Sequence, residues 1–125
     1  MFAGEVDLKT WYKPKFDKKT LKELSKRSDI KGLLDTSIFI VALILSGYLC
    51  ILSWGTLWSI PALLLYGNIF YCKIISIQHE TNHETYFKTR ALNKFFYHIT
   101  SLLGGFEAVR WKWSHFHHHT YTIFT

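Results

Sequence analysis

Two histidine clusters contain six of the seven histidines in the sequence. The first cluster is His79 and His83, in the segment HETNHETYF. If residues 78–87 are helical, these two side chains form an i, i+4 pair and lie on one face. Paired neutral imidazoles are metal ligands, although an isolated HxxxH pattern also occurs on helix surfaces with no ion. The first cluster alone therefore does not decide between a metal site and a surface pair.

The second cluster lies in the segment WKWSHFHHHTYT. In a helix, His115, His118 and His119 stand at i, i+3 and i+4, within about a third of the circumference. His117 points about 200° away from His115, toward the opposite side. An HHH run also occurs in purification tags, but those lie at termini and are longer. The spacing therefore predicts three converging imidazoles here.

Together the clusters supply five imidazoles that can converge on one place. Nitrogen donors of this kind, with few sulfur partners, suit iron, zinc, copper or nickel. Five ligands are too many for one tetrahedral zinc ion. The sequence therefore predicts part of a two-metal site. His98 stands alone between the clusters and is interpreted as a hydrogen-bonded or polar-face histidine.

The elements that position these clusters are dominated by one long apolar stretch. Residues 36–72 contain no Asp, Glu, Lys or Arg, and 49% of the chain is hydrophobic. A membrane span needs about 20 residues, so this stretch predicts two spans, residues 35–53 and 59–77, joined by a tight turn. A buried hairpin in a soluble protein is the alternative, but the rest of the chain is too short to cover it. The expected fold is an all-α integral membrane hairpin.

The charges predict how this hairpin is oriented. Nine of the fifteen Lys and Arg precede Asp35, and the other six follow Tyr71. By the positive-inside rule, both termini are cytoplasmic and the turn faces out. The net charge of +6 then favours anionic lipid headgroups as the partner of the basic ends and gives no support to nucleic acid. Cys50 and Cys72 are too far apart in this hairpin to form a disulfide.

Three regions follow from this arrangement. Residues 1–34 form a basic N-terminal region, which begins with an irregular interfacial arm and has helical character over residues 19–27. Residues 35–77 form the transmembrane hairpin. Residues 78–125 carry both histidine clusters, and a short amphipathic segment, residues 91–106, is expected to lie at the membrane interface and return the chain toward His79. The N-terminus lacks the apolar core of a signal peptide, so the first span itself would direct insertion.

With these motifs in hand, the sequence resembles the membrane fatty acid desaturase family. The segment HETNHETYF, residues 79–87, matches the H-E-x-x-H-x-T-x-F form of the first histidine box of that family. The following KTRALN segment is also similar, and SHFHHHTYT, residues 114–122, matches S-H-x-x-H-H-x-Y-T of the second box. The resemblance covers roughly residues 20–125.

The resemblance implies a di-iron site at the cytoplasmic face of a bacterial inner membrane or the endoplasmic reticulum. It implies O2-dependent removal of hydrogens from an acyl chain carried on a lipid, coenzyme A or a carrier protein. Electrons would come from a donor such as ferredoxin or cytochrome b5. Glu80 would hydrogen-bond a ligand imidazole. The implied metal ligands are His79, His83, His115, His118 and His119.

The chain departs from the family pattern because a third histidine box is absent from it. We therefore expect a fragment that is inactive by itself. A related membrane di-iron hydroxylase or ketolase would carry the same motifs. A zinc metalloprotease is a further alternative, in which Glu80 of HExxH is the general base and Glu107 a third ligand, but it leaves the second cluster unexplained. A non-catalytic membrane protein is the last alternative.

Overall fold

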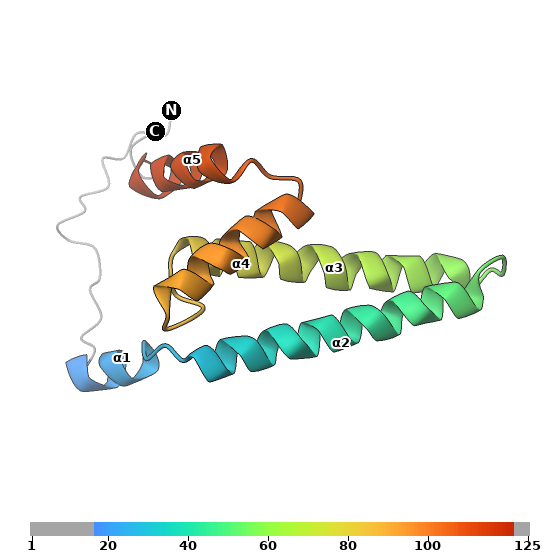
Figure 1. The fold of residues 1–125 in the computed structure, drawn as a ribbon, viewed down its shortest axis with the longest axis horizontal. Coiled ribbons are helices and arrows are strands. Elements are labelled where there is room, and N and C mark those ends of the chain that lie inside the picture. Colours follow the sequence, from blue (N-terminus) through green and yellow to red (C-terminus); the bar gives the residue numbers. More distant parts are fainter. Residues whose placement is uncertain (1–16, 122–125) are drawn as a thin grey trace, which may run out of the picture.

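The computed structural model describes residues 17–121, and within this range it contains helices and their connections but no strands. The expected irregular arm up to Phe16 and the part of the second box beyond Tyr121 lie outside the described residues. Figure 1 shows a long hairpin of two helices with two shorter helices packed at the end away from the turn. The helices are α1 (Lys18–Leu24), α2 (Asp29–Ser53), α3 (Ser59–Asn82), α4 (Arg90–Leu103) and α5 (Ala108–Tyr121).

Helices α2 and α3 form the hairpin that the uncharged stretch predicts. They contain 25 and 24 residues, so each is about 36–37 Å long and exceeds a hydrocarbon core of about 30 Å. The turn between them contains Gly55, whose φ of 78° is readily available to glycine. The two helices lie side by side along their length (Figure 1). Both are long and apolar enough to cross a membrane.

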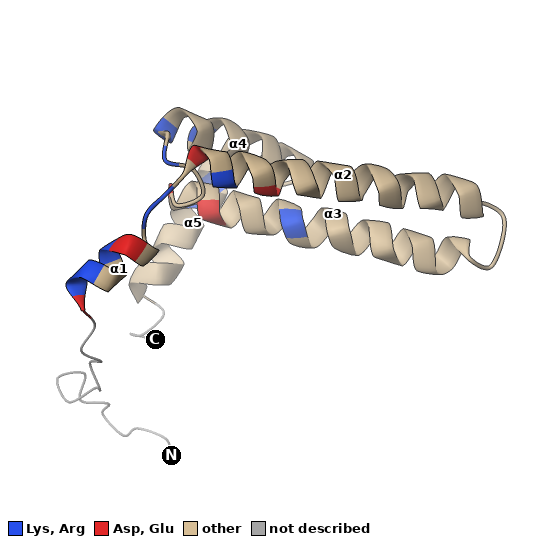
Figure 2. Ribbon diagram, turned by 90° about the horizontal axis from the view of Figure 1, so that it is seen from below, with Lys and Arg blue, Asp and Glu red and all other residues tan. Residues whose placement is uncertain are grey.

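The surface of the hairpin is largely apolar and exposed. Only 17% of the most apolar 18-residue window of α2 is buried, and only 11% of that of α3. A core helix of a soluble protein would bury most of such a window, so this distribution is typical of helices that face lipid. Figure 2 shows that charged residues gather at the end of the hairpin away from the turn.

The helix that carries the first histidine pair ends earlier than expected. The sequence predicts a helix through Phe87, but α3 ends at Asn82 and His83 is its C-cap. Glu84 then adopts a left-handed φ of 57°, and the Thr85 N–H donates to the Glu80 carbonyl at 3.0 Å. This is the Schellman arrangement, which stops a helix while satisfying its last carbonyls. The chain turns sharply after His83 as a result.

The segment after the first pair is fixed by buried contacts. The Phe87 side chain is fully buried, and the Asn93 side chain pairs with its backbone through bonds of 3.0 and 2.8 Å. Gly32 of α2 faces the Phe87 ring, where a Cβ would lie 2.7 Å from two ring carbons. Asp29, at the start of α2, accepts hydrogen bonds from the Thr89 N–H and Oγ1. These contacts join the loop to α2.

Helices α4 and α5 return the chain toward the end of α3. The sequence predicts a helix over residues 91–106, and α4 begins one residue earlier and ends three residues earlier, at Leu103. It ends at a second Schellman arrangement, with Gly105 at φ 72° and the Phe106 N–H donating to the Ser101 carbonyl at 2.8 Å. Helix α4 packs on α3, and α5 packs on α4. This reversal brings α5 back near the end of α3 that lies away from the hairpin turn (Figure 1).

Candidate metal centre

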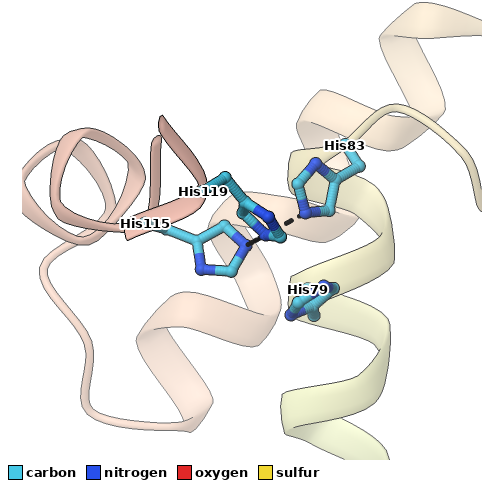
Figure 3. A group of neighbouring side chains, drawn as sticks. All are labelled: His79, His83, His115 and His119. Atoms are coloured by element: carbon cyan, nitrogen blue, oxygen red, sulfur yellow. Dashed lines mark hydrogen bonds between the residues drawn. The ribbon is translucent and has the colours of Figure 1, made fainter. Parts of the chain in front are cut away.

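Four histidines from two helices meet at one point. His79 lies in the last turn of α3 and His83 caps that helix, while His115 and His119 project from α5 (Figure 3). One ring nitrogen from each lies within 4.8 Å of the corresponding nitrogen of every other member. The i, i+4 spacing within each cluster places both members of a pair on the face directed at the other helix.

The closest approaches in this group centre on His115. Its Nε2 lies 3.0 Å from Nε2 of His83 and 3.0 Å from Nε2 of His119. An imidazole nitrogen has one in-plane position, which holds either a proton or a lone pair, so it cannot pair fully with two neighbours. A metal ion resolves this conflict because it accepts a lone pair from every ring. The donor set therefore fits a transition metal ion better than a hydrogen-bonded network.

The separations also bear on the number of ions. When an ion binds imidazoles at about 2.0–2.1 Å, neighbouring ligand nitrogens lie about 3–4 Å apart. Four nitrogens within 4.8 Å match the surroundings of one ion. Two ions about 3.5–4 Å apart would spread their terminal ligands farther and would need more donors. Binding of two irons stays a prediction that requires donors besides these four.

The remaining histidines lie outside this group. His118 is the fifth predicted ligand, and its ring centroid lies 6.3 Å from that of His115. It borders the site, so its role as a ligand stays a prediction. The His117 ring stacks on Tyr121, with centroids 5.4 Å apart, and the His98 ring contacts Tyr97 on α4. Neither belongs to the group of four, as the helical spacing predicts for His117.

The surroundings of His115 and His83 favour the neutral form of these two rings. Burial, followed by the neighbouring histidines, lowers the pKa of His115 from 6.5 to about 4. Burial and the charges of His79 and His119 also lower the pKa of His83, and the negative charge of Glu80 opposes this shift. A neutral imidazole is the form that binds a metal, so the site favours ligation near neutral pH.

Trp111 is a site residue whose contact the sequence analysis missed. Its ring stacks on His115, with centroids 4.5 Å apart and planes at 11°, and its centroid also lies 6.4 Å from that of His79. From the sequence, Trp111 is expected to mark the membrane interface, with a substrate-lining role as the weaker alternative. The signal for the contact is the i, i+4 spacing between Trp111 and His115, which puts an aromatic ring beside a ligand on the same helix face.

Glu80 and Glu107, the two glutamates with predicted roles at the site, accept other hydrogen bonds. The Glu80 carboxylate accepts a hydrogen bond from Thr85 Oγ1 at 2.5 Å. Glu107 accepts from the backbone N–H groups of Val109 and Arg110 at the start of α5, and it does not belong to the histidine group. A site of four imidazoles without Glu107 differs from the three-ligand zinc site of a metalloprotease. The proposed bond from Glu80 to a ligand ring stays a prediction.

The chain was also compared with known proteins. Neither models of protein families, nor curated proteins, nor solved structures gave a match.

Proposed function

We propose that this chain is the histidine-bearing portion of a membrane fatty acid desaturase, an O2-dependent oxidoreductase that introduces a double bond into an acyl chain. The proposal joins two features of the molecule: a hairpin long and apolar enough to cross a membrane, and a histidine cluster at one end of that hairpin. The resemblance of residues 79–87 and 114–122 to the two histidine boxes of that family supports the specific reaction.

The convergence of four imidazoles is the observation that carries the proposal. His79 and His83 are separated from His115 and His119 by a loop, a helix and a second turn, yet all four ring nitrogens lie within 4.8 Å. Histidines scattered on a surface have no reason to meet in this way. A site made only of neutral nitrogen donors suits iron, copper, nickel or zinc, and iron is the member of this set that supports oxygen chemistry on acyl chains in the family resembled.

The membrane placement of the site follows from the hairpin. The charged residues lie at the end of α2 and α3 that also holds the histidines, and the turn at the other end has no Lys or Arg (Figure 2). By the positive-inside rule, this distribution supports a site at the cytoplasmic face. Counting from Ser59 at 1.5 Å per residue, His79 lies about 30 Å along α3, at the far boundary of the hydrocarbon core. An acyl chain in the bilayer would reach the site from that boundary.

The residues of the candidate metal centre would have distinct roles in this reaction. Iron held here would activate O2 with electrons from a donor such as ferredoxin or cytochrome b5. The four histidines bind the metal, and stacking by Trp111 fixes the direction of the His115 ring. The Schellman turn after His83 redirects the chain without leaving the last carbonyls of α3 unpaired. His118, beside the group of four, is the proposed donor for a second iron.

A related membrane hydroxylase or ketolase uses the same kind of site, so the histidine geometry favours neither reaction. The difference lies in the product: an alcohol or a ketone retains an oxygen atom, whereas desaturation leaves only a double bond. Mass spectrometry of the acyl chains separates these outcomes directly. The substrate is an acyl group on a lipid, coenzyme A or a carrier protein, and its polar head would lie on the cytoplasmic side.

To test this proposal, the chain is expressed in a lipid-producing host, both alone and within its genomic reading frame. Acyl chains are compared among the wild type, His115→Ala and the control His98→Ala, whose ring lies outside the cluster. We expect a new unsaturated acyl chain from the reading frame with the wild type and with His98→Ala, and none with His115→Ala. The 125 residues alone are expected to give no product. An unchanged acyl profile from all forms, with the protein present in membranes and loaded with iron, would refute the desaturase proposal.

A further inference from the structure

A second hollow lies about the start of α2, away from the histidines. Its volume is about 650 Å³, and it is formed where α1, the α1–α2 connection, the first turn of α2 and the α3–α4 loop meet. Six of its lining residues are charged. They are the cations Lys26, Arg27, Lys31 and Lys88 and the acids Glu23 and Asp29.

The charge of this hollow is not balanced by its own residues. Asp29 is occupied by Thr89, which donates to it from its N–H at 2.8 Å and from Oγ1 at 2.7 Å. The ion pairs found within residues 17–121 are Lys73–Asp35 and Arg90–Glu84, and neither includes a cation of the hollow. Four cations thus face two acids, one of which is already hydrogen-bonded. The surplus positive charge favours an anionic occupant.

The expected depth of the hollow in a bilayer favours a lipid phosphate as the source of that anion. If residues 35–53 cross the hydrocarbon core, Lys31 lies about 6 Å beyond its boundary. The headgroup layer on each side of a bilayer is about 5–7 Å thick, so the cations lie at the level of lipid phosphates. Leu24 and Ile30 border the same hollow and are 80% and 79% exposed. This step rests on the membrane placement proposed above and not on the metal chemistry.

We propose that this hollow binds the headgroup of an anionic phospholipid, with the phosphate among Lys26, Arg27, Lys31 and Lys88. Three of the cations belong to the N-terminal side of α2, whereas Lys88 belongs to the loop that follows the first histidine pair. A bound lipid therefore holds these two parts of the chain together at the membrane surface.

The test measures single-lipid binding to the full chain in a nonionic detergent by native mass spectrometry. The protein is titrated with phosphatidylglycerol and with phosphatidylcholine of the same acyl chains. The triple variant Lys26→Gln/Arg27→Gln/Lys31→Gln is compared with Lys18→Gln/Lys19→Gln/Lys22→Gln, which removes the same charge from α1 outside the hollow. Each cation near a lipid surface contributes about fivefold in affinity, so the first triple variant should bind phosphatidylglycerol on the order of a hundredfold more weakly.

Several outcomes would overturn the proposal. Equal loss in both triple variants would mean diffuse attraction to the basic end and no specific site. Equal wild-type affinity for the two lipids would exclude recognition of the extra charge. Displacement of the lipid by millimolar inorganic phosphate would assign the hollow to a free anion.

Misfolding is controlled by circular dichroism and by the single variant Lys88→Gln, which lies outside the helices and should weaken binding about fivefold. Iron content measured on the same samples separates this test from the desaturase proposal, because the hollow contains no site histidine. If Lys88→Gln binds the lipid as tightly as the wild type does, the α3–α4 loop is not part of the proposed site.

Discussion

Trp111 and His115 stack nearly parallel on one face of α5, with ring centroids 4.5 Å apart and planes at 11°. The indole also contacts Tyr97 of α4 and Phe106 of the preceding turn, at centroid distances of 6.4 and 6.2 Å. The orientation of the most central ligand is therefore set by an aromatic side chain that is anchored to α4 and to the turn before α5.

Replacing Trp111 with Leu should weaken metal binding while leaving the helices intact. Aromatic stacking is worth about 0.5–1.5 kcal/mol, so we expect affinity for the metal to fall about two- to twelvefold. Competition with a chelator of known affinity measures this change. Trp113→Leu is the matched control, because Trp113 is 61% exposed and contacts Phe116 and not a member of the histidine group. Equal losses in the two variants would contradict an orienting role for Trp111.

The ligand set predicts unequal effects of histidine substitutions on metal content. His115→Ala removes the ring that lies 3.0 Å from two other ligands, and we expect less than about a tenth of the wild-type metal to remain. His118→Ala should retain one ion per chain because its ring lies outside the group of four. Elemental analysis of the purified full chain after iron loading gives these numbers. Complete metal loss in His118→Ala would place that ring in the same coordination sphere.

The lowered pKa of His115 predicts an acid-sensitive metal-free protein. The folded pKa of about 4 lies below the unfolded value of 6.5, so the unfolded chain binds the proton first as the pH falls. Stability should therefore fall from pH 6.5 toward pH 4, and His115 should add no pH dependence above that window. Thermal unfolding of metal-free protein in detergent at several pH values tests this sign. A His115→Gln variant should lose less stability over the same window, and an identical slope would assign the effect to other groups.

Gly32→Ala should destabilise the packing of α2 against the loop after the first histidine pair. The new Cβ would lie 2.7 Å from the Phe87 ring and 3.0 Å from the Tyr86 carbonyl oxygen, so the backbone or the ring must move. Overpacking of this kind costs about 1–3 kcal/mol. Gly67→Ala is the control: it meets nothing within 4 Å and should stabilise α3 slightly, because alanine is the better helix former. Unfolding in detergent by a chemical denaturant compares the two, and a Gly32→Ala protein as stable as the wild type would contradict the close contact.

The sequence predicts well what depends on spacing along one element. The uncharged residues 36–72 predict the helical hairpin, and the i, i+4 pattern predicts that His79 and His83 share a face. The C-terminal end of α3 could not be predicted, because the helix stops at a left-handed Glu84, a conformation more typical of glycine or asparagine. The residue type at position 84 therefore does not predict that the helix ends there.

Contacts between segments that are distant in the sequence could not be predicted either. The bonds from Thr89 to Asp29 span 60 positions in the sequence, and nothing local to either residue specifies its partner. The stacking of Trp111 on His115 had a local signal in its i, i+4 spacing, but tryptophan near an apolar segment is more often placed at a membrane interface. Convergence of the two histidine pairs depends on the turn at Gly104 and Gly105, whose direction the sequence pattern does not give.

Helix α3 is continuous from Ser59 to Asn82, so the first histidine pair is rigidly attached to the end of this long helix. The second pair belongs to α5, which packs on α4. A tilt of α3 relative to α4 and α5 would displace the ring nitrogens of the first pair relative to those of the second pair. If α3 spans a bilayer, a mismatch between its apolar length and the bilayer thickness would favour a tilt of this kind, and the spacing of the four donors would change with it.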